Sequence, residues 1–178
     1  DSVKTLPCLE IKDMPAFSYR GMHLDEVHRF FGTELIKQYI DAMAKLKLNQ
    51  FHWQLADEIK WRITMKADST LADKEQFYTT TQIKEIVKYA QDRFINITPE
   101  IDLPSATENT SIERNKAVID EVCALFPGPY VHIGNGMTDT SSLQYLLSKN
   151  KKIIGQDYAP HKEEILMSYK SNKSGWGA

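Results

Sequence analysis

The sequence has few of the features that would place a protein in a specialised class. Only two cysteines occur among 178 residues, too few for a disulfide framework. No apolar run approaches the ~18 residues of a membrane-spanning helix. Lysine and arginine number 22 against 24 acidic residues, for a net charge of -2, and no basic cluster interleaves with aromatic residues. We therefore expect neither a membrane nor nucleic acid as a partner.

The sequence does have an ordinary globular composition and a repeating strand–helix pattern. Hydrophobic residues make up 42% of the chain, and no linker or low-complexity stretch divides it. Apolar β-type runs alternate with stretches of helical periodicity. Strands are predicted at 19–25, 50–55, 94–98, 130–133, 152–157 and 165–168, with helices opening near Gly32, Thr79, Ser111 and Ser141. Thr79 and Gln82 have the spacing of a capping box.

This alternation predicts an α/β domain with a parallel sheet, of the (β/α) TIM-barrel type. Five or six βα units can be counted over residues 1–178, whereas a complete barrel has eight. We therefore predict one domain with a shortened or incomplete barrel. The edge strands of an open sheet present unpaired backbone N–H and C=O groups that can pair with another chain, so we also expect a homo-oligomer that covers them.

Candidate site residues follow the predicted strands, because ligands of α/β proteins gather at strand ends. The most informative end is Tyr130–Asp139, where an apolar run leads into Gly134-Asn135-Gly136 and then into small polar residues. Carboxylates follow two other strands, at Asp57 and at Glu100 with Asp102. Such carboxylates can do acid–base work, although solvated loop residues and hydrogen bonds within a barrel would give the same pattern.

The histidines favour structural positions. His52 and His132 lie inside predicted strands and fit buried core histidines better than ligands. His23, His28 and His161 show no spacing with carboxylates or cysteines that would bind zinc. The sequence therefore predicts no metal site and no cofactor.

Several motifs, in order between about Leu9 and Ser168, together carry a resemblance. They are Tyr19-Arg20-Gly21-Met22-His23-Leu24-Asp25, Leu48-Asn49-Gln50-Phe51-His52-Trp53, Trp61-Arg62-Ile63, Pro99-Glu100-Ile101-Asp102-Leu103-Pro104 and Tyr130-Val131-His132-Ile133-Gly134. These motifs resemble the β-N-acetylhexosaminidases of glycoside hydrolase family 20. The resemblance implies a barrel enzyme whose substrate's own acetamido oxygen attacks the anomeric carbon, an exception to the usual two-carboxylate mechanism. It also implies a periplasmic, secreted or lysosomal setting.

The same resemblance shows where this chain departs from the family. In the family an Asp that orients the acetamido group and a Glu that is the general acid follow the fourth strand. Gly136 and Met137 occupy those two positions here. Neither side chain can orient an amide or donate a proton, and Asp139 is the nearest carboxylate that could replace the acid.

The sugar-binding positions are partly kept. The family's arginine after the first strand corresponds to His28, with Arg29 next to it, while Asp57 matches a pocket residue directly and Glu58 replaces its neighbour conservatively. The candidate catalytic residues are Asp57, Glu100 and Asp139. The candidate substrate-binding residues are His28, Arg29, His52, Glu58, Asp102 and His132.

Three functions are compatible with this pattern. The first is a catalytically impaired domain that still binds N-acetylhexosamine-containing glycans, because loss of a general acid typically forfeits ~10²–10⁴ in rate. The second is an active β-N-acetylhexosaminidase that uses Asp139 or Glu100. The third is a trimmed or engineered barrel framework without a ligand. The first two imply a glycan or amino sugar as the partner.

Overall fold

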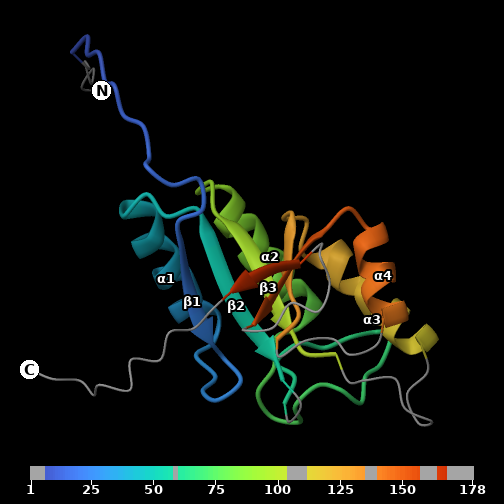
Figure 1. Ribbon diagram of the computed structural model, residues 1–178. Helices are drawn as coiled ribbons and strands as arrows, with labels where there is room; N and C mark the ends of the chain where they lie inside the picture. Colours follow the sequence, from blue (N-terminus) through green and yellow to red (C-terminus); the bar gives the residue numbers. More distant parts are fainter. Residues whose placement is uncertain (1–6, 58–59, 104–111, 135–139, 157–163, 168–178) are drawn as a thin grey trace, which may run out of the picture.

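The computed structural model describes residues 7–57, 60–103, 112–134, 140–156 and 164–167 (Figure 1). Its elements are β1 (Gly21–Asp25), α1 (Thr33–Lys45), β2 (Gln50–Ala56), α2 (Thr80–Gln91), β3 (Asn96–Ile101), α3 (Ile112–Leu125), β4 (Tyr130–His132), α4 (Thr140–Ser148), β5 (Lys152–Gln156) and β6 (Glu164–Met167). Strands and helices alternate from β1 to β5, as the sequence predicts. That all of residues 1–178 form one domain stays a prediction.

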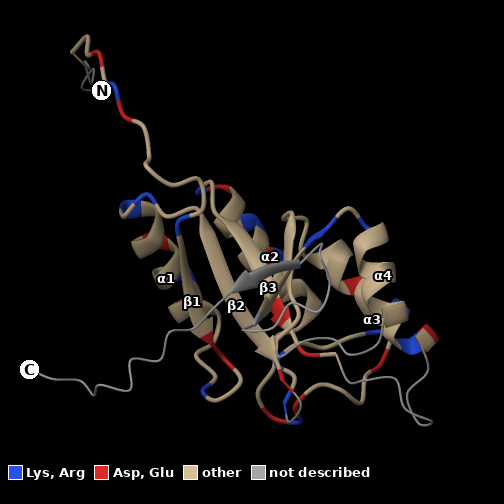
Figure 2. Ribbon diagram, in the orientation of Figure 1, with Lys and Arg blue, Asp and Glu red and all other residues tan. Residues whose placement is uncertain are grey.

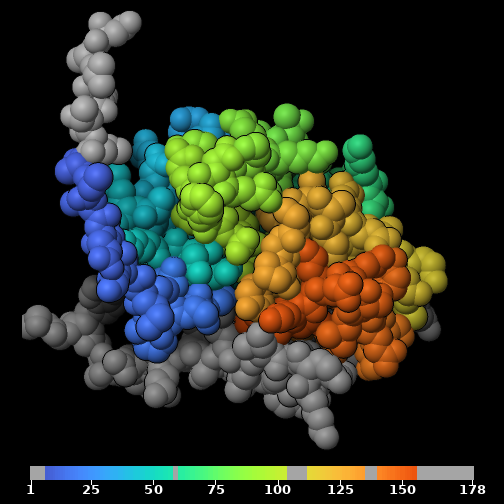
Figure 3. Space-filling view, turned by 90° about the horizontal axis from the view of Figure 1, so that it is seen from above, coloured from blue at the N-terminus to red at the C-terminus, as the bar shows by residue number. Residues whose placement is uncertain are grey.

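The six strands form one parallel sheet in the order β1-β2-β3-β4-β5-β6. Each βα unit therefore lies beside the previous one in sequence, which is the strand order of a (β/α) barrel. The colours of Figure 3 accordingly run in sequence order across the molecule. Since β1 and β6 are the edge strands of the described sheet, the expected incomplete barrel is confirmed. Self-association through these edges stays a prediction.

The two faces of the sheet differ in chemistry, because successive side chains of a strand point to opposite faces. Phe51, Trp53 and Leu55 of β2 are at most 1% exposed and belong to the apolar core. Ile36 and Ile83, from α1 and α2, belong to the same core, and the helices cover this face of the sheet (Figure 1). The opposite face, which would line the interior of a barrel, carries polar side chains.

Charged residues lie mainly on the helices and loops, with both signs interspersed, while most of the sheet is uncharged (Figure 2). Within the described residues, no helix is both long and apolar enough to cross a lipid bilayer.

The boundary of β3 differs from the prediction. The sequence places Phe94 and Ile95 in the strand because aromatic and β-branched residues favour strands. Phe94 instead has a φ of 58° and is 90% exposed. Its N–H donates to the Gln91 carbonyl at 3.0 Å, so it terminates α2 in a left-handed conformation. The other end of α2 is as predicted, with Thr79 and Gln82 forming the capping box.

Candidate functional site

The carboxyl ends of β1 to β4 lie at the same end of the parallel sheet. Asp25 ends β1, Asp57 and Asp102 directly follow β2 and β3, and Gly134 lies two residues after β4. Asp102 lies against the Gly134 backbone: a Cβ placed on Gly134 would be 2.9 Å from Asp102 Cγ. Gly134 also has a φ of +63°, which disfavours a side chain. The close approach of the β3 and β4 ends therefore requires a glycine here.

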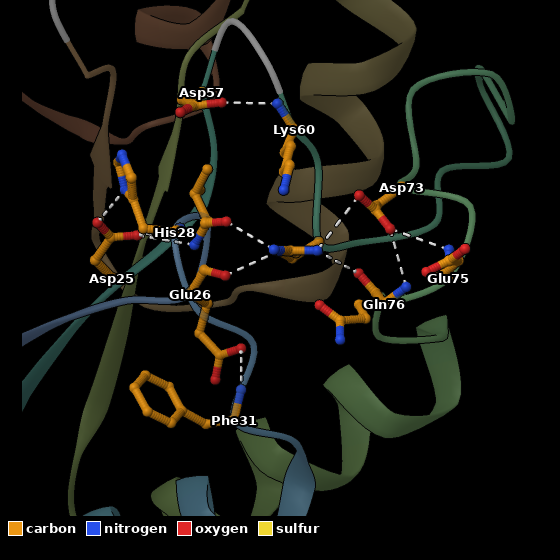
Figure 4. Close-up of polar contacts among 11 residues, drawn as sticks. Asp25, Glu26, His28, Phe31, Asp57, Lys60, Asp73, Glu75 and Gln76 are labelled. Carbon is orange, nitrogen blue, oxygen red and sulfur yellow. Dashed lines mark hydrogen bonds and ion pairs between the residues drawn. The ribbon is translucent and has the colours of Figure 1, made fainter.

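The predicted pair His28 and Arg29 lies in the loop after β1. Asp25 orders this loop: its Oδ1 accepts the backbone N–H groups of Val27 at 2.8 Å and His28 at 3.1 Å. Its Oδ2 lies 2.6 Å from His28 Nδ1 (Figure 4). Arg29 is exposed, with its guanidinium carbon 5.3 Å from the centre of the Phe31 ring. Because Asp25 engages the His28 ring, Arg29 is the better placed of the two to offer a cation to a ligand.

Asp57 closes a short turn after β2. Its Oδ1 accepts the Lys60 backbone N–H at 2.7 Å, and its own N–H donates to the Lys60 carbonyl at 3.0 Å (Figure 4). The carboxylate therefore orders the exit from β2, and its role toward a ligand stays a prediction. Its neighbour Glu58 lies outside the described residues.

A buried polar cluster of Glu26, Arg62 and Tyr78, here named the exit cluster, ties these loops together. The Arg62 guanidinium donates to three backbone carbonyls, those of Glu26 at 2.9 Å, Val27 at 2.7 Å and Gln76 at 3.1 Å. It also lies 3.4 Å from an Asp73 carboxylate oxygen. Figure 4 shows Glu26, from the segment after β1, near Asp73 and Gln76, which both come from the connection that leads to α2. Arg62 therefore fixes the chain after β1 to the long connection that leads to α2.

The carboxyl group of Glu26 is fully buried within the exit cluster. It accepts the Tyr78 hydroxyl at 2.9 Å and the Phe31 N–H at 3.2 Å. Burial raises the pKa of Glu26 to about 7, although these donors and Arg62 work in the other direction. Sequence reasoning missed Glu26, because a charged residue just after a strand has the appearance of a solvated loop residue. The signal that could have pointed to this cluster is the Trp61-Arg62-Ile63 motif, because it contains Arg62.

A second cluster lies on the polar face of the sheet and comprises His23, His52, Glu100 and His132, here named the histidine cluster. Glu100 is at its centre: its Oε2 lies 2.5 Å from His52 Nε2, 3.7 Å from His23 Nε2 and 3.6 Å from His132 Nδ1. The ring centroids of His23 and His52 are 4.5 Å apart, as are those of His52 and His132. Strands β1 to β4 thus each contribute one member.

The histidine cluster is buried except on the β1 side. The His52, Glu100 and His132 side chains are at most 5% exposed, whereas that of His23 is 35% exposed. The predicted burial of His52 and His132 is confirmed. His132 Nδ1 accepts the Gly134 N–H at 3.1 Å, which places the proton of a neutral ring on Nε2.

Burial also sets the protonation of these groups. It lowers the pKa of His132 to about 4 and lowers that of His52, despite the nearby Glu100. Burial alone would raise the pKa of Glu100. The imidazoles of His23, His52 and His132 outweigh burial and lower the pKa of Glu100 to about 2. At neutral pH the cluster therefore consists of a carboxylate surrounded by imidazoles, with the buried ones neutral.

The structure differs from the prediction made from the sequence about metal ligands. The spacing of His23 in the sequence predicts no zinc site, yet His23, His52 and Glu100 offer ligand atoms within 4.8 Å of one another. Strand pairing explains the difference, because His23 lies beside His52 in the β1–β2 register. Glu100 then lies on the next strand, opposite Gln54. His28 lies with Asp25 instead, and His161 is outside the described residues.

Some predicted residues cannot be placed. Asp139, the proposed replacement acid, lies outside the described residues, as do Gly136 and Met137 at the family's acid positions. Hollows lined by described residues lie on the helix side of the sheet. One, of about 10 Å³, is lined by apolar residues of β3, α3, β4 and α4, including Ile101, Ile119 and Leu146. Another, of about 230 Å³, opens between α2 and α3 and is lined by Lys84 and Glu121 among others.

Comparisons with known proteins place the chain among glycosidases. The family model described as the glycosyl hydrolase family 20 catalytic domain matches residues 17–114. A beta-hexosaminidase of Porphyromonas gingivalis is 33% identical over 84% of this chain and 28% of its own length. A beta-hexosaminidase of Vibrio furnissii is 27% identical over 90% of this chain and 40% of its own length.

Solved structures agree with the sequence comparisons. A family 20 exo-beta-N-acetylglucosaminidase of Vibrio harveyi, in complex with N-acetylglucosamine, has a TM-score of 0.73 and 26% identity, covering 89% of this chain and 39% of that one. A family 20 enzyme of Streptomyces coelicolor, at 22% identity, shares the fold with a TM-score of 0.76 over 93% of this chain and 45% of that one.

The chain spans between 28% and 45% of the length of these relatives. The alignment with the Porphyromonas protein runs over 217 positions, more than the 178 residues of this chain. The relative therefore has insertions that this chain lacks, which agrees with shortened connections between the strands.

Proposed function

Because the chain belongs to glycosyl hydrolase family 20, we propose that it is a hexosaminidase-like domain that binds N-acetylhexosamine-containing glycans and has lost most hydrolytic activity. The similar proteins are beta-hexosaminidases, and one of the similar structures holds N-acetylglucosamine. The observation that carries the loss of activity is the pair Gly136-Met137, which stands where the family has an Asp-Glu pair.

The chemistry of substrate-assisted hydrolysis explains why this pair matters. The leaving oxygen must receive a proton, and the acetamido group must be oriented and stabilised while its oxygen attacks. A thioether at Met137 cannot donate the proton, which forfeits ~10²–10⁴ in rate. A glycine at 136 removes the electrostatic partner of the acetamido group, and losses of this kind are on the order of 10²–10³.

The alternative is an active β-N-acetylhexosaminidase with a different acid, and the described carboxylates argue against it. Glu100 has a pKa lowered to about 2 and is nearly buried, so it holds no proton to donate near neutral pH. Asp57 orders its own turn through Lys60. Asp139 is left as the candidate acid for an active enzyme, and it enters the test below for that reason.

Sugar binding needs less of the catalytic machinery than hydrolysis. Arg29 offers an exposed cation, and the carboxylates of Asp57 and Asp102 at neighbouring strand ends can accept sugar hydroxyls in charge-assisted hydrogen bonds. His28 contacts Asp25 and lies at the same carboxyl ends of the strands. His52 and His132 are buried beneath these ends, so we assign them to support of the site rather than to direct contact.

Two measurements on the same protein test this proposal. An aryl N-acetyl-β-glucosaminide assay should show no release of the chromophore above the buffer rate. Titration of labelled protein with N-acetylglucosamine should give saturable NMR shifts at the strand-end residues. Turnover that is lost in Asp139→Asn would establish the active enzyme instead, and no response in either experiment would establish a ligand-free framework.

A matched pair of variants locates the sugar site. Asp57→Asn keeps an oxygen that can accept the Lys60 N–H but removes the charge, and we expect about tenfold weaker sugar binding, or ~1.4 kcal/mol. Asp92→Asn is the control. Asp92 caps the C-terminus of α2, four residues before β3 begins, and so lies toward the amino ends of the strands, away from the proposed site. Equal affinity of both variants and the parent would exclude Asp57 from the site.

A further inference from the structure

Outside the strand-end site, the histidine cluster brings together metal-ligating side chains that the proposed sugar binding does not use. We propose that His23, His52 and Glu100 form a binding site for a divalent transition-metal cation, with Zn²⁺ as the best match. Two imidazole nitrogens and one carboxylate oxygen are a ligand set that proteins use for zinc when a fourth position is left to water. These three residues come from the adjacent strands β1, β2 and β3.

Distances support a shared ion. The potential ligand atoms of the three residues lie within 4.8 Å of one another. Glu100 Oε2 is 2.5 Å from His52 Nε2 and 3.7 Å from His23 Nε2. Ligands at ~2.0–2.1 Å from a tetrahedral zinc are roughly 3.3 Å apart. Binding therefore requires adjustments of up to about 1.5 Å between side chains, and no change in the strands.

A second observation is that two buried polar atoms of the cluster have partners only within it. His52 Nε2 and Glu100 Oε2 are both inaccessible to solvent and lie 2.5 Å apart, and among the described residues no hydrogen bond from outside the cluster reaches either atom. Buried polar atoms in folded proteins nearly always have a partner. A cation that is coordinated by both side chains would replace this contact with two ligand bonds.

His132 is an outer neighbour of this site rather than a ligand. Its Nδ1, the nitrogen nearer Glu100, already accepts the Gly134 N–H. Its ring packs on that of His52, with centroids 4.5 Å apart, and so limits how the His52 ring can turn. Such packing around first ligands is what fixes their orientation in metal sites.

The position of His23 gives the ion a route of entry. The His23 side chain is 35% exposed and belongs to the edge strand β1, while the other two ligands are nearly buried. Metal binding would therefore join an edge strand to two inner strands of the open sheet. We expect the ion to stabilise the fold, because it binds the assembled strands and not the separated ones.

The test uses the full chain without a histidine tag. Equilibrium dialysis against Zn²⁺ followed by elemental analysis should give one ion per chain, and the thermal midpoint should rise with Zn²⁺ concentration. His23→Gln should weaken binding at least tenfold and abolish the rise. This variant is chosen first because His23 is partly exposed, so that its replacement spares the core.

Two controls separate this site from other zinc ligands. His28→Gln removes the one described histidine outside the cluster, which also has a carboxylate partner, and Cys8→Ser removes an exposed thiol. Both should bind Zn²⁺ like the parent, and Co²⁺ in the parent should show no thiolate charge-transfer band. Unchanged binding in His23→Gln, or loss of binding in either control, would overturn the proposal.

Discussion

The exit cluster and the histidine cluster are both buried and polar, and they differ in how their hydrogen bonds are used. In the exit cluster, Arg62 donates to three backbone carbonyls, and the Glu26 carboxyl accepts a hydroxyl and a backbone N–H. In the histidine cluster, side chains meet mainly side chains, and His52 Nε2 and Glu100 Oε2 have partners only within the cluster. A network that is directed at the backbone fixes the chain, whereas a network of metal-ligating side chains that contact one another can exchange those contacts for an ion.

The strongest test of this contrast removes the centre of the exit cluster. Arg62→Met leaves the buried carbonyls of Glu26 and Val27 without their donor and the Asp73 carboxylate without its ion-pair partner. We expect the free energy of unfolding to fall by about 3–5 kcal/mol in urea denaturation. Lys88→Met is the control. Its ion pair with Asp92 is exposed, so its loss should change stability by less than about 0.5 kcal/mol.

The pH dependence of the histidine cluster provides a second test. Burial lowers the pKa of His132 from 6.5 to about 4, so the folded state resists its protonation. Stability from this group is complete above pH 6.5 and is lost as the pH falls toward 4, by on the order of 2–3 kcal/mol. His132→Gln should flatten that decline in urea melts between pH 7 and 4. An unchanged acid slope would show that His132 does not titrate as a buried group.

The exit cluster should respond to pH in the opposite direction. Burial raises the pKa of Glu26 from 4.5 to about 7, so the folded state favours the protonated carboxyl. Stability from this group is complete below pH 4.5 and is lost as the pH rises through 7, by on the order of 2–3 kcal/mol. Glu26→Gln imitates the protonated form and should be more stable than the parent at pH 8.5. At pH 4.5 the two should differ little, and a constant difference across this range would contradict the assignment.

The smallest expected effect concerns Gly134, which connects the histidine cluster to the strand ends. Gly134→Ala places a Cβ 2.9 Å from Asp102 Cγ at a φ of +63°. We expect a loss of about 1–2 kcal/mol in unfolding free energy, since the residue must adopt a left-handed conformation. Sugar affinity should fall as well, because Asp102 is displaced. A Gly128→Ala variant shows the effect of crowding alone, because its Cβ would lie 3.0 Å from the Ile97 carbonyl oxygen at a glycine without a positive φ.

The fold could be predicted from the sequence because its signals lie within short stretches of the chain. Apolar runs and helical periodicity predict the order of the elements, and Thr79 with Gln82 predicts the start of α2. The start of β3 was wrong because Phe94 has a strand-forming side chain but a left-handed backbone. Backbone conformation at a helix end depends on packing that a short window does not contain.

The candidate site was less predictable because its parts are distant in sequence. The burial of His52 and His132 was expected from the strands that contain them. Their convergence with His23 on Glu100 depends on the register of four strands, which no local pattern specifies. Glu26 escaped notice for a related reason, since its partners Arg62 and Tyr78 come from a connection tens of residues away.

The central claim is that the chain binds an amino sugar without hydrolysing it, and one NMR titration tests it directly. Labelled protein is mixed with a methyl N-acetyl-β-glucosaminide, and protein shifts and sugar signals are followed in the same sample. We predict saturable shifts near Asp57 and Asp102, with the glycoside intact after prolonged incubation. Appearance of free N-acetylglucosamine, or an unperturbed protein spectrum at saturating sugar, would contradict the claim.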